Sequence, residues 1–234
     1  MTPANASITL RVFSRLLSYP DAAVRGDLTD MRAALRAEKA LPDRRLDELD
    51  TFMTNLERAG PLDAEAEYVD IFDRSRATSL HLFEHVHGDS RDRGPAMIDL
   101  AQTYEKAGLF LAPDEMPDYL PVVLEFVSTQ PATEACAFLG EMAHIFNAMF
   151  NALQQRDSGY ASVLGGLLEL AGEKAHAVKV VPDEPLDTSW EEPAVFDGCS
   201  AKGQAKPGQA QPVNFVKGGI NDTARPRGNA GASL

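Results

Sequence analysis

The sequence predicts an all-α protein, and two observations carry the prediction. From Ile8 to Ala177 apolar residues recur three or four positions apart, which places them on one face of a helix. No run of alternating apolar and polar residues bounded by turn signals predicts a pair of β-strands. A chain of 234 residues that is 44% hydrophobic also has enough apolar material for one sizeable core. We therefore expect a single compact multi-helix domain.

Proline and glycine divide this pattern into separate helices. The pairs Tyr19-Pro20, Leu41-Pro42 and Gly60-Pro61 end the first three apolar stripes, and such short connections predict antiparallel neighbours. Gly165 and Gly166 predict a close approach of the last helix to a neighbour. The expected helices cover residues 8–17, 24–35, 46–56, 63–75, 79–86, 95–107, 122–129, 133–156 and 160–178, with a proline-rich turn at 112–121.

The composition changes beyond residue 181. Residues 182–197 are acidic and rich in proline, and residues 198–234 consist largely of Gly, Ala, Gln, Asn and Pro. Such segments bury too little apolar surface to offset the entropy of ordering. We expect an all-helical domain over residues 1–181, an acidic extension over 182–197 and a disordered C-terminal tail over 198–234.

Charge is distributed unevenly along the chain. The net charge is -13, but residues 198–234 carry five basic residues and one acidic residue, so residues 1–197 stand at -17. This body disfavours nucleic acid as a partner and favours a basic one, because complementary fields steer encounter. A surface kept soluble by carboxylates would explain the same charge.

Location and redox state follow from other features of the sequence. The N-terminus lacks a basic region followed by an apolar run, and no window of about 18 apolar residues occurs. We therefore expect a cytoplasmic protein without stable membrane insertion. Cys136 and Cys199 lack C-x-x-C spacing, so we expect no disulfide framework and an inert, buried thiol at Cys136.

The segment Ser79–Val86 contains the pattern H-x-x-E-H at His81, Glu84 and His85. On a helix the two histidines would share one face and could hold Zn²⁺, with Glu84 as general base of a hydrolase. The expected helix is short, however, and Gly88 ends it. Two other interpretations stay open, which are a hydrogen-bonded turn over an apolar pocket and a recognition surface for a basic amphipathic peptide.

Other catalytic patterns are absent from the sequence. It contains no G-x-S-x-G, no glycine-rich phosphate loop with lysine and no dinucleotide-binding fingerprint. Arg91 and Arg93 precede a helix and could hold an anion, although a solvated loop of alternating charge explains them equally well.

Four stretches together resemble a known family. They are RLLSYPD (Arg15–Asp21), YVDIFDRSRATSLHLFEHVHGDSRDRGPAMIDL (Tyr68–Leu100), YEKAGL (Tyr104–Leu109) and DEMPDYLPVVLEF (Asp114–Phe126). They are similar to the NarJ-type molybdenum cofactor assembly chaperones, the delta subunits of respiratory nitrate reductase, within the all-helical redox-enzyme maturation chaperones. The resemblance runs in order from about Ile8 to Phe196, and only the tail departs from it.

The resemblance implies a chaperone without enzymatic activity or a cofactor of its own. Such proteins bind the basic N-terminal segment of the catalytic (alpha) subunit, a relic of a twin-arginine signal. They keep that subunit competent for insertion of the molybdenum cofactor and delay its docking to the membrane subunit. The cofactor delivery machinery is a further partner that the resemblance suggests.

From motif position and residue chemistry together we expect a peptide-binding groove. Its acidic members would meet arginine or lysine, and its apolar members would meet apolar anchors of the segment. A core role for the aromatic members stays open, and so do a zinc hydrolase and a generic interaction scaffold as functions of the chain. The predicted groove residues are Tyr68, Phe72, His81, Leu82, Phe83, Glu84, His85, Asp118, Tyr119 and Glu125.

Overall fold

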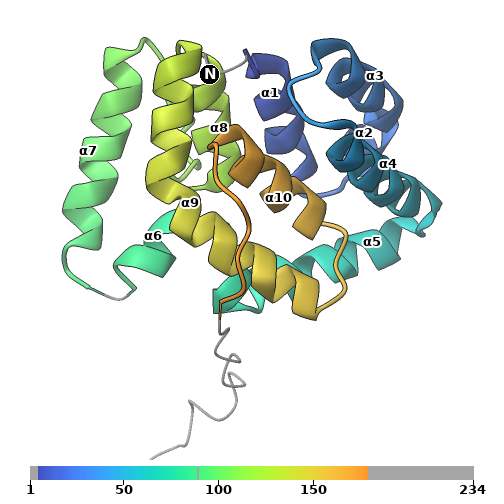
Figure 1. The fold of residues 1–234 in the computed structure, drawn as a ribbon. Helices are drawn as coiled ribbons and strands as arrows, with labels where there is room; N and C mark the ends of the chain where they lie inside the picture. The colour runs from blue at the N-terminus through green and yellow to red at the C-terminus, as the bar shows by residue number, and fades with distance from the viewer. Residues whose placement is uncertain (1–4, 89, 179–234) are drawn as a thin grey trace, which may run out of the picture. The chain divides into compact units, whose positions relative to one another are not determined.

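Helices build the structure, a computed structural model that describes residues 5–88 and 90–178 (Figure 1). Across these residues the backbone makes strand-like pairing only at an isolated bridge between His81 and Tyr119, so the all-α prediction is confirmed. The elements are α1 (Ser7–Leu16), α2 (Ala22–Gly26), α3 (Leu28–Glu38), α4 (Asp43–Arg58), α5 (Pro61–Tyr68), the π-helical turn η1 (Val69–Asp73), the 3₁₀ turn η2 (Arg76–Thr78), α6 (Leu82–Val86), α7 (Arg93–Lys106), α8 (Leu120–Ser128), α9 (Ala132–Gln155) and α10 (Ala161–Leu170).

Several expected helices have different limits in the structure. The stripe over 24–35 divides into α2 and α3, and the side chain of Asp21 caps α2 by accepting a hydrogen bond from the Val24 N–H at 2.8 Å. The last helix ends at Leu170 instead of residue 178, because Gly172 takes a φ of 77° that ends a helix in the left-handed region. The chain after Gly172 then runs back along α9, where Asn147 and Asn151 donate to the His176 carbonyl.

The expected helix over 63–75 changes its hydrogen-bonding register. It begins at Pro61 as α5 and continues after Tyr68 as the π-helical turn η1. Side chains outside this turn donate hydrogen bonds to its backbone carbonyls. The Arg156 guanidinium donates to the Asp70 carbonyl at 3.1 Å, and the Thr78 hydroxyl donates to the Ile71 carbonyl. The turn carries the chain from α5 toward the segment that holds His81.

Helix α10 lies in the core, between α9 and α4. All its residues from Ala161 to Leu168 are buried. A Cβ added at Gly166 would lie 2.5 Å from the Phe13 ring, and one at Gly165 would overlap the guanidinium of Arg45. The predicted close approach at these two glycines is therefore confirmed. Arg45 is itself buried and pairs with Glu48 and Glu169.

Helices α1 and α8 form the other closely packed pair and run antiparallel. The Ser14 hydroxyl donates to the Pro121 carbonyl at 2.8 Å, and Arg11 donates to the Ser128 hydroxyl at 3.3 Å. The C-terminal end of α1 therefore lies beside the N-terminal end of α8. This arrangement brings Tyr19, which follows α1, to the same side of the fold as Tyr119, which precedes α8.

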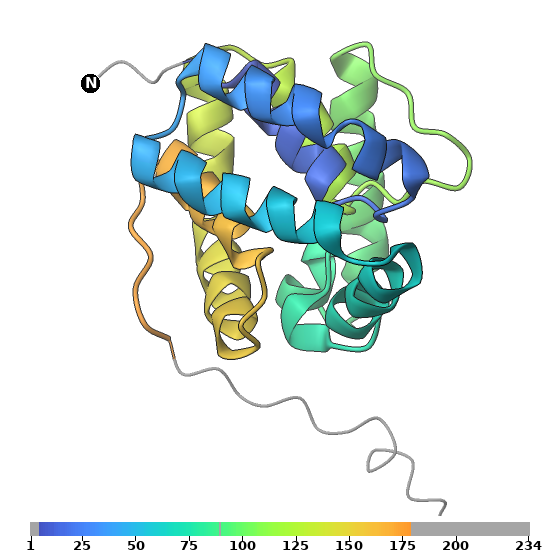
Figure 2. The ribbon, with the colours of Figure 1, turned by 90° about the vertical axis from the view of Figure 1, so that its right-hand side faces the viewer.

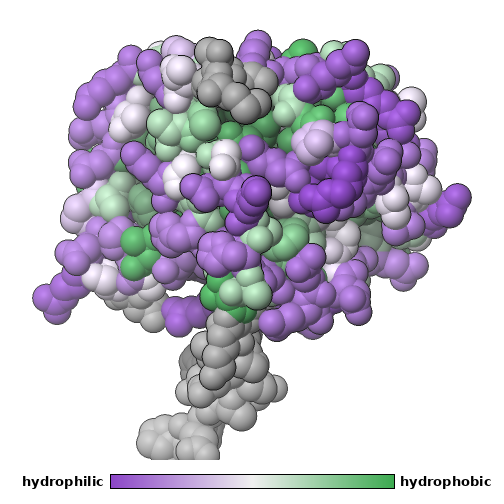
Figure 3. All heavy atoms as spheres, in the orientation of Figure 1, coloured by the Kyte–Doolittle hydropathy of each residue, from purple (hydrophilic) through white to green (hydrophobic). Residues whose placement is uncertain are grey.

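Charged side chains dominate the exposed faces. Figure 2 shows α3 and α4 crossing the face turned to the viewer, and Figure 3 shows hydrophilic side chains over most of a second face, with apolar patches between them. None of the helices in the described part of the chain is long and apolar enough to cross a membrane. The expected boundary at residue 181, the extension over 182–197 and the tail over 198–234 lie outside the described residues.

Candidate functional site

Two segments that are distant in sequence meet at the start of α6. The Leu82 N–H donates to the Asp118 carbonyl at 3.0 Å, and the Leu120 N–H donates to the Leu80 carbonyl at 2.8 Å. His81 and Tyr119 face each other across this bridge, with ring centroids 5.4 Å apart. We call residues 79–86 the recognition turn, and the bridge fixes this turn to the lead-in of α8.

Asp118 is the central residue of this junction. Its side chain is fully buried, and Oδ2 accepts a hydrogen bond from the Phe83 N–H at 3.2 Å, which caps the first turn of α6. Its Oδ1 lies 3.4 Å from Nδ1 of His81, and its Oδ2 lies 3.7 Å from the guanidinium of Arg93, the first residue of α7. One carboxylate thus joins α6, α7 and the segment before α8.

The zinc-ligand arrangement that H-x-x-E-H spacing suggested is not formed. His81 is the N-cap of α6 and has extended backbone angles, so it does not share a helix face with His85. Nε2 of His85 lies 2.8 Å from the Ser79 carbonyl, and Glu84 lies 3.7 Å from Arg93. Within residues 5–88 and 90–178, no three His, Cys, Asp or Glu side chains are placed to hold a metal ion. The motif instead forms a hydrogen-bonded turn.

Titration of His81 is coupled to Asp118. The hydrogen bond to Asp118 raises the pKa of His81 above its ordinary value, and this effect outweighs the burial that lowers it. The carboxylate of Glu84 acts in the same direction, whereas Arg93 opposes it. His81 therefore takes up its proton at a higher pH than a free histidine does.

Tyrosine side chains connect this junction to α1 and α5. The Tyr68 hydroxyl donates to the Leu17 carbonyl at 2.8 Å and lies 3.1 Å from the hydroxyl of Tyr119. The edge of the Tyr19 ring meets the Tyr68 ring, with centroids 5.5 Å apart. Burial raises the pKa of Tyr68 and Tyr119, so both stay neutral in the physiological range. We call Tyr19, Tyr68 and Tyr119 the tyrosine row.

The ten predicted groove residues divide into a buried and an accessible set. The buried set is Tyr68, Phe72, Leu82 and Asp118, and the partly or fully accessible set is His81, Phe83, Glu84, His85, Tyr119 and Glu125. The buried residues form the floor of the junction and do not reach a docked peptide in this conformation. A charge reversal at Asp118 would place a cation in a fully buried position and should destabilise the fold.

A cavity of about 440 Å³ with both apolar and charged lining residues lies along α8, and Glu125 is one of the residues that line it. Tyr104 and Phe126 contribute apolar surface, and their rings pack with centroids 4.8 Å apart. The volume falls in the range of ligand-binding pockets. The cavity, which we call the α8 cavity, is lined by Arg11, Arg15, Tyr104, Leu109, Phe110, Leu111, Glu115, Val122, Glu125, Phe126, Ser128 and Thr129.

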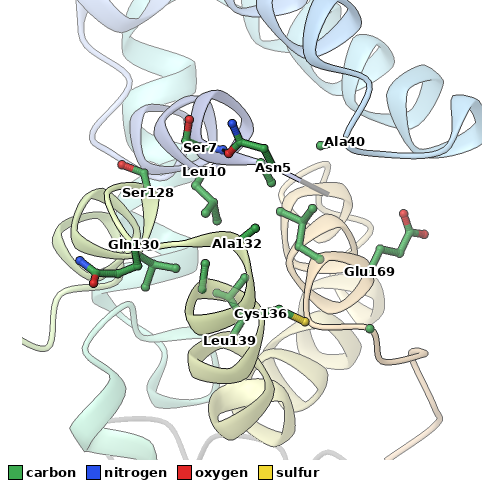
Figure 4. A pocket seen from close by; sticks show the side chains of 15 residues that line it. Asn5, Ser7, Leu10, Ala40, Ser128, Gln130, Ala132, Cys136, Leu139 and Glu169 are labelled. Carbon is green, nitrogen blue, oxygen red and sulfur yellow. Dashed lines mark hydrogen bonds between the residues drawn. The ribbon is translucent and has the colours of Figure 1, made fainter. Parts of the chain in front are cut away.

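A second cavity of about 370 Å³ lies between the start of α1, the start of α9 and the end of α10 (Figure 4). Leu10 and Leu139 line it, and Cys136 points its sulfur toward α10. Cys136 is half-buried and its thiol is free, which corrects the expectation of a fully buried thiol. The carboxylate of Glu169 turns away from the cavity toward Arg44 and Arg45.

Sequence reasoning missed the role of Arg93. The sequence around Arg93 suggests a solvated loop or an anion-binding group, whereas the Arg93 guanidinium lies 3.7 Å from both Glu84 and Asp118. Its partners come from two other segments, so no local spacing points to them. The alternation of charge in SRDR was compatible with this contact but did not single it out.

Comparisons with known proteins agree on one family. The family model described as "Nitrate reductase delta subunit" matches residues 29–164. The chain is 45% identical over 198 residues to the nitrate reductase molybdenum cofactor assembly chaperone NarJ of Escherichia coli, which covers 80% of this chain and 84% of that protein. It is 30% identical over 169 residues to the protein named NarJ of Bacillus subtilis, covering 72% of this chain and 90% of that one.

A solved structure shares the fold. The crystal structure of a candidate redox enzyme maturation protein from Archaeoglobus fulgidus matches with a TM-score of 0.52 and 20% sequence identity. The match covers 71% of this chain and 94% of that chain. At this identity the likeness concerns the helical architecture alone.

Proposed function

Because the chain belongs to the nitrate reductase delta subunit family, we propose that it is an assembly chaperone of nitrate reductase and not an enzyme. The observation that carries this proposal is the 45% identity to NarJ over 84% of that protein's length. The catalytic subunit of nitrate reductase is then its partner. The chaperone keeps this subunit competent for insertion of the molybdenum cofactor and for timed assembly with the membrane subunit, and it acts in the cytoplasm, where the cofactor delivery machinery is a further partner.

The basic N-terminal segment of the catalytic subunit is the proposed ligand. Residues 1–197 carry a charge of -17, which attracts such a segment and orients its approach. The segment would bind as an amphipathic element, with cationic side chains toward carboxylates and apolar side chains in a groove. The charge of the chaperone alone would attract many cations, so selectivity must come from local contacts.

The accessible part of the predicted groove supplies such contacts. His81, Phe83, Glu84 and His85 lie on the recognition turn, which the buried carboxylate of Asp118 holds in place. Holding the turn before the ligand arrives lowers the entropy cost of binding. Tyr119 continues this surface onto α8.

The α8 cavity extends the proposed groove with apolar surface. Glu125, Val122 and Phe126 line it from the same helix. Its volume of about 440 Å³ accommodates one or two apolar side chains of the segment. Phe110, which is 79% exposed, provides further apolar surface at the cavity.

Calorimetric titration tests the proposal with a synthetic peptide that matches the N-terminus of the catalytic subunit. The control is a scrambled peptide of equal length and charge, and the zinc content of the same protein sample is measured. We expect the native peptide to bind selectively, with an affinity that falls as salt rises. Equal affinity for both peptides would contradict a dedicated chaperone. One zinc ion per chain would instead support a zinc site at His81, Glu84 and His85.

A further inference from the structure

Tyr19 presents an aromatic ring to solvent beside the proposed groove. Its side chain is 44% exposed, although it follows α1 directly and contacts the core through Tyr68. Tyr68 is in turn fixed by its hydrogen bond to the Leu17 carbonyl. The exposed ring is therefore held by a buried neighbour and is available for contact with a ligand.

Two carboxylates come from the elements next to this ring: Glu65 lies three residues before Tyr68 on α5, and Asp73 is the last residue of η1. Partial burial of the ring together with Glu65 of α5 and Asp73 of η1 raises the pKa of the Tyr19 hydroxyl. Asp73 acts in the same way on Tyr68 and Tyr119. Among the residues that the structure describes, neither Glu65 nor Asp73 forms a salt bridge.

A further buried tyrosine packs against Tyr68. Tyr160 is 2% exposed, and in the described structure its hydroxyl oxygen has no hydrogen-bond partner. Its ring centroid lies 6.1 Å from that of Tyr68, and burial, with smaller effects of Glu67 and Tyr119, raises the pKa of its hydroxyl. A ligand group or a water molecule that reached this hydroxyl would satisfy it.

Guanidinium chemistry matches this combination of groups. A planar guanidinium stacks on an aromatic face and directs several N–H donors toward carboxylates or hydroxyl oxygens at the same time. A lysine ammonium is compact and strongly hydrated, and it cannot form the stacked contact while donating along a rigid fork. A row of tyrosines bordered by carboxylates should therefore prefer arginine to lysine.

We infer that Tyr19, Tyr119, Glu65 and Asp73 form a subsite that takes one arginine side chain of the bound N-terminal segment. The inference rests on the proposed function and adds a specificity element to it. The row begins at Tyr119, on the bridge that holds the recognition turn, and ends at Tyr19, so an arginine here would set the position of the segment along the groove. The subsite would select for arginine at one position, whereas the α8 cavity would select for apolar side chains at others.

The test combines peptide and protein variants in calorimetric titrations. Each arginine of the catalytic-subunit peptide is replaced in turn by lysine, and each peptide is titrated into the wild-type protein and into the variants E65Q/D73N and Y19L. Replacement of one particular arginine should weaken binding to the wild-type protein roughly three- to tenfold, as expected for a partly exposed cation–π contact with two carboxylates. In both variants this loss should shrink to less than twofold.

Control variants separate local contacts from the overall field. D47N/E141Q removes two exposed carboxylates from α4 and α9 and matches the charge change of E65Q/D73N, and it should keep the preference for arginine. Y19F keeps the aromatic ring and should also keep the preference for arginine. If the wild-type protein binds the peptide but no arginine-to-lysine change discriminates between wild type and variants, the subsite is refuted and the chaperone proposal stands. If the wild-type protein does not bind the peptide at all, both are refuted.

Discussion

Removal of the Asp118 carboxylate should open the recognition turn. Asp118 is fully buried, caps α6 through the Phe83 N–H and lies within 3.7 Å of Arg93. The change D118A removes a helix cap, worth about 1 kcal/mol, and leaves two partly buried donors without their acceptor, at a further cost of about 1–3 kcal/mol. We expect the free energy of unfolding to fall by about 3 kcal/mol in total.

The isosteric change D118N separates the cap from the charge. Asparagine can still accept from the Phe83 N–H through its amide oxygen, but it cannot neutralise Arg93 or hold a protonated His81. We expect about half the loss of D118A, roughly 1.5 kcal/mol. D114A is the matched control, because Asp114 is exposed in the same proline-rich turn, and its effect should stay within about 0.5 kcal/mol.

Urea denaturation and limited trypsin digestion measure the two consequences. Denaturation gives the loss of global stability, and cleavage at Arg91, which is exposed between α6 and α7, reports opening of the turn. D118A should be cleaved faster than wild type under conditions in which D114A is not. A D118A protein with wild-type stability and wild-type cleavage would show that the carboxylate does not organise the junction.

Four further predictions concern the packing of α10, the protonation of His81 and the α8 cavity. G166A should cost about 1–3 kcal/mol in urea denaturation, since its Cβ would lie 2.5 Å from the Phe13 ring, whereas G140A on the exposed side of α9 should be neutral or stabilising; equal effects would contradict the packing of α10. The stabilising contribution of His81, whose folded-state pKa is raised, should be fully present below about pH 6.5 and lost as pH rises through that raised value; an H81N protein whose stability difference from wild type does not change between pH 6 and pH 9 would refute the coupling to Asp118. As the pH falls, His81 should take up its proton before the pH reaches 6.5, because its pKa is raised, and the added positive charge should weaken binding of a cationic peptide. An affinity that stays flat from pH 8 to about 5.5 would show that the histidines are not part of the groove. F110S should leave the fold unchanged, because the side chain is 79% exposed, and weaken peptide binding in calorimetry; unchanged affinity would place the apolar anchors outside the α8 cavity.

Local sequence patterns predicted the helices and several of their contacts. Spacing of apolar residues located α1, α4 and α9 to within a few residues, and the glycine pair in α10 indicated the close approach that Phe13 and Arg45 complete. The apolar spacing that predicts a helix depends on neighbours within about one helical turn, so a single sequence contains that information. The identity of Phe13 and Arg45 as the partners of the glycines follows only from the fold. The π-helical turn after Tyr68 escaped prediction because its hydrogen bonds depend on Arg156 and Thr78, which come from other segments.

The candidate site was less predictable for the same reason. His81 and His85 have helical spacing, but the cap from Asp118, 37 residues away from His81, makes His81 the residue before α6 instead of a member of it. The burial of Asp118 and its contact with Arg93 follow from the packing of α6, α7 and the start of α8 against one another. No local sequence pattern predicts that packing. The tyrosine row likewise joins residues from three segments.

The most direct test of the central claim is the molybdenum content of the catalytic subunit. Nitrate reductase subunits that belong with this chaperone would be produced in cells lacking other chaperones of this family, with and without this chain, and molybdenum would be measured per purified catalytic subunit. We predict a nearly full complement with the chain and a large deficit without it, with E65Q/D73N in between. Equal molybdenum content in both preparations would contradict a role in assembly of the enzyme.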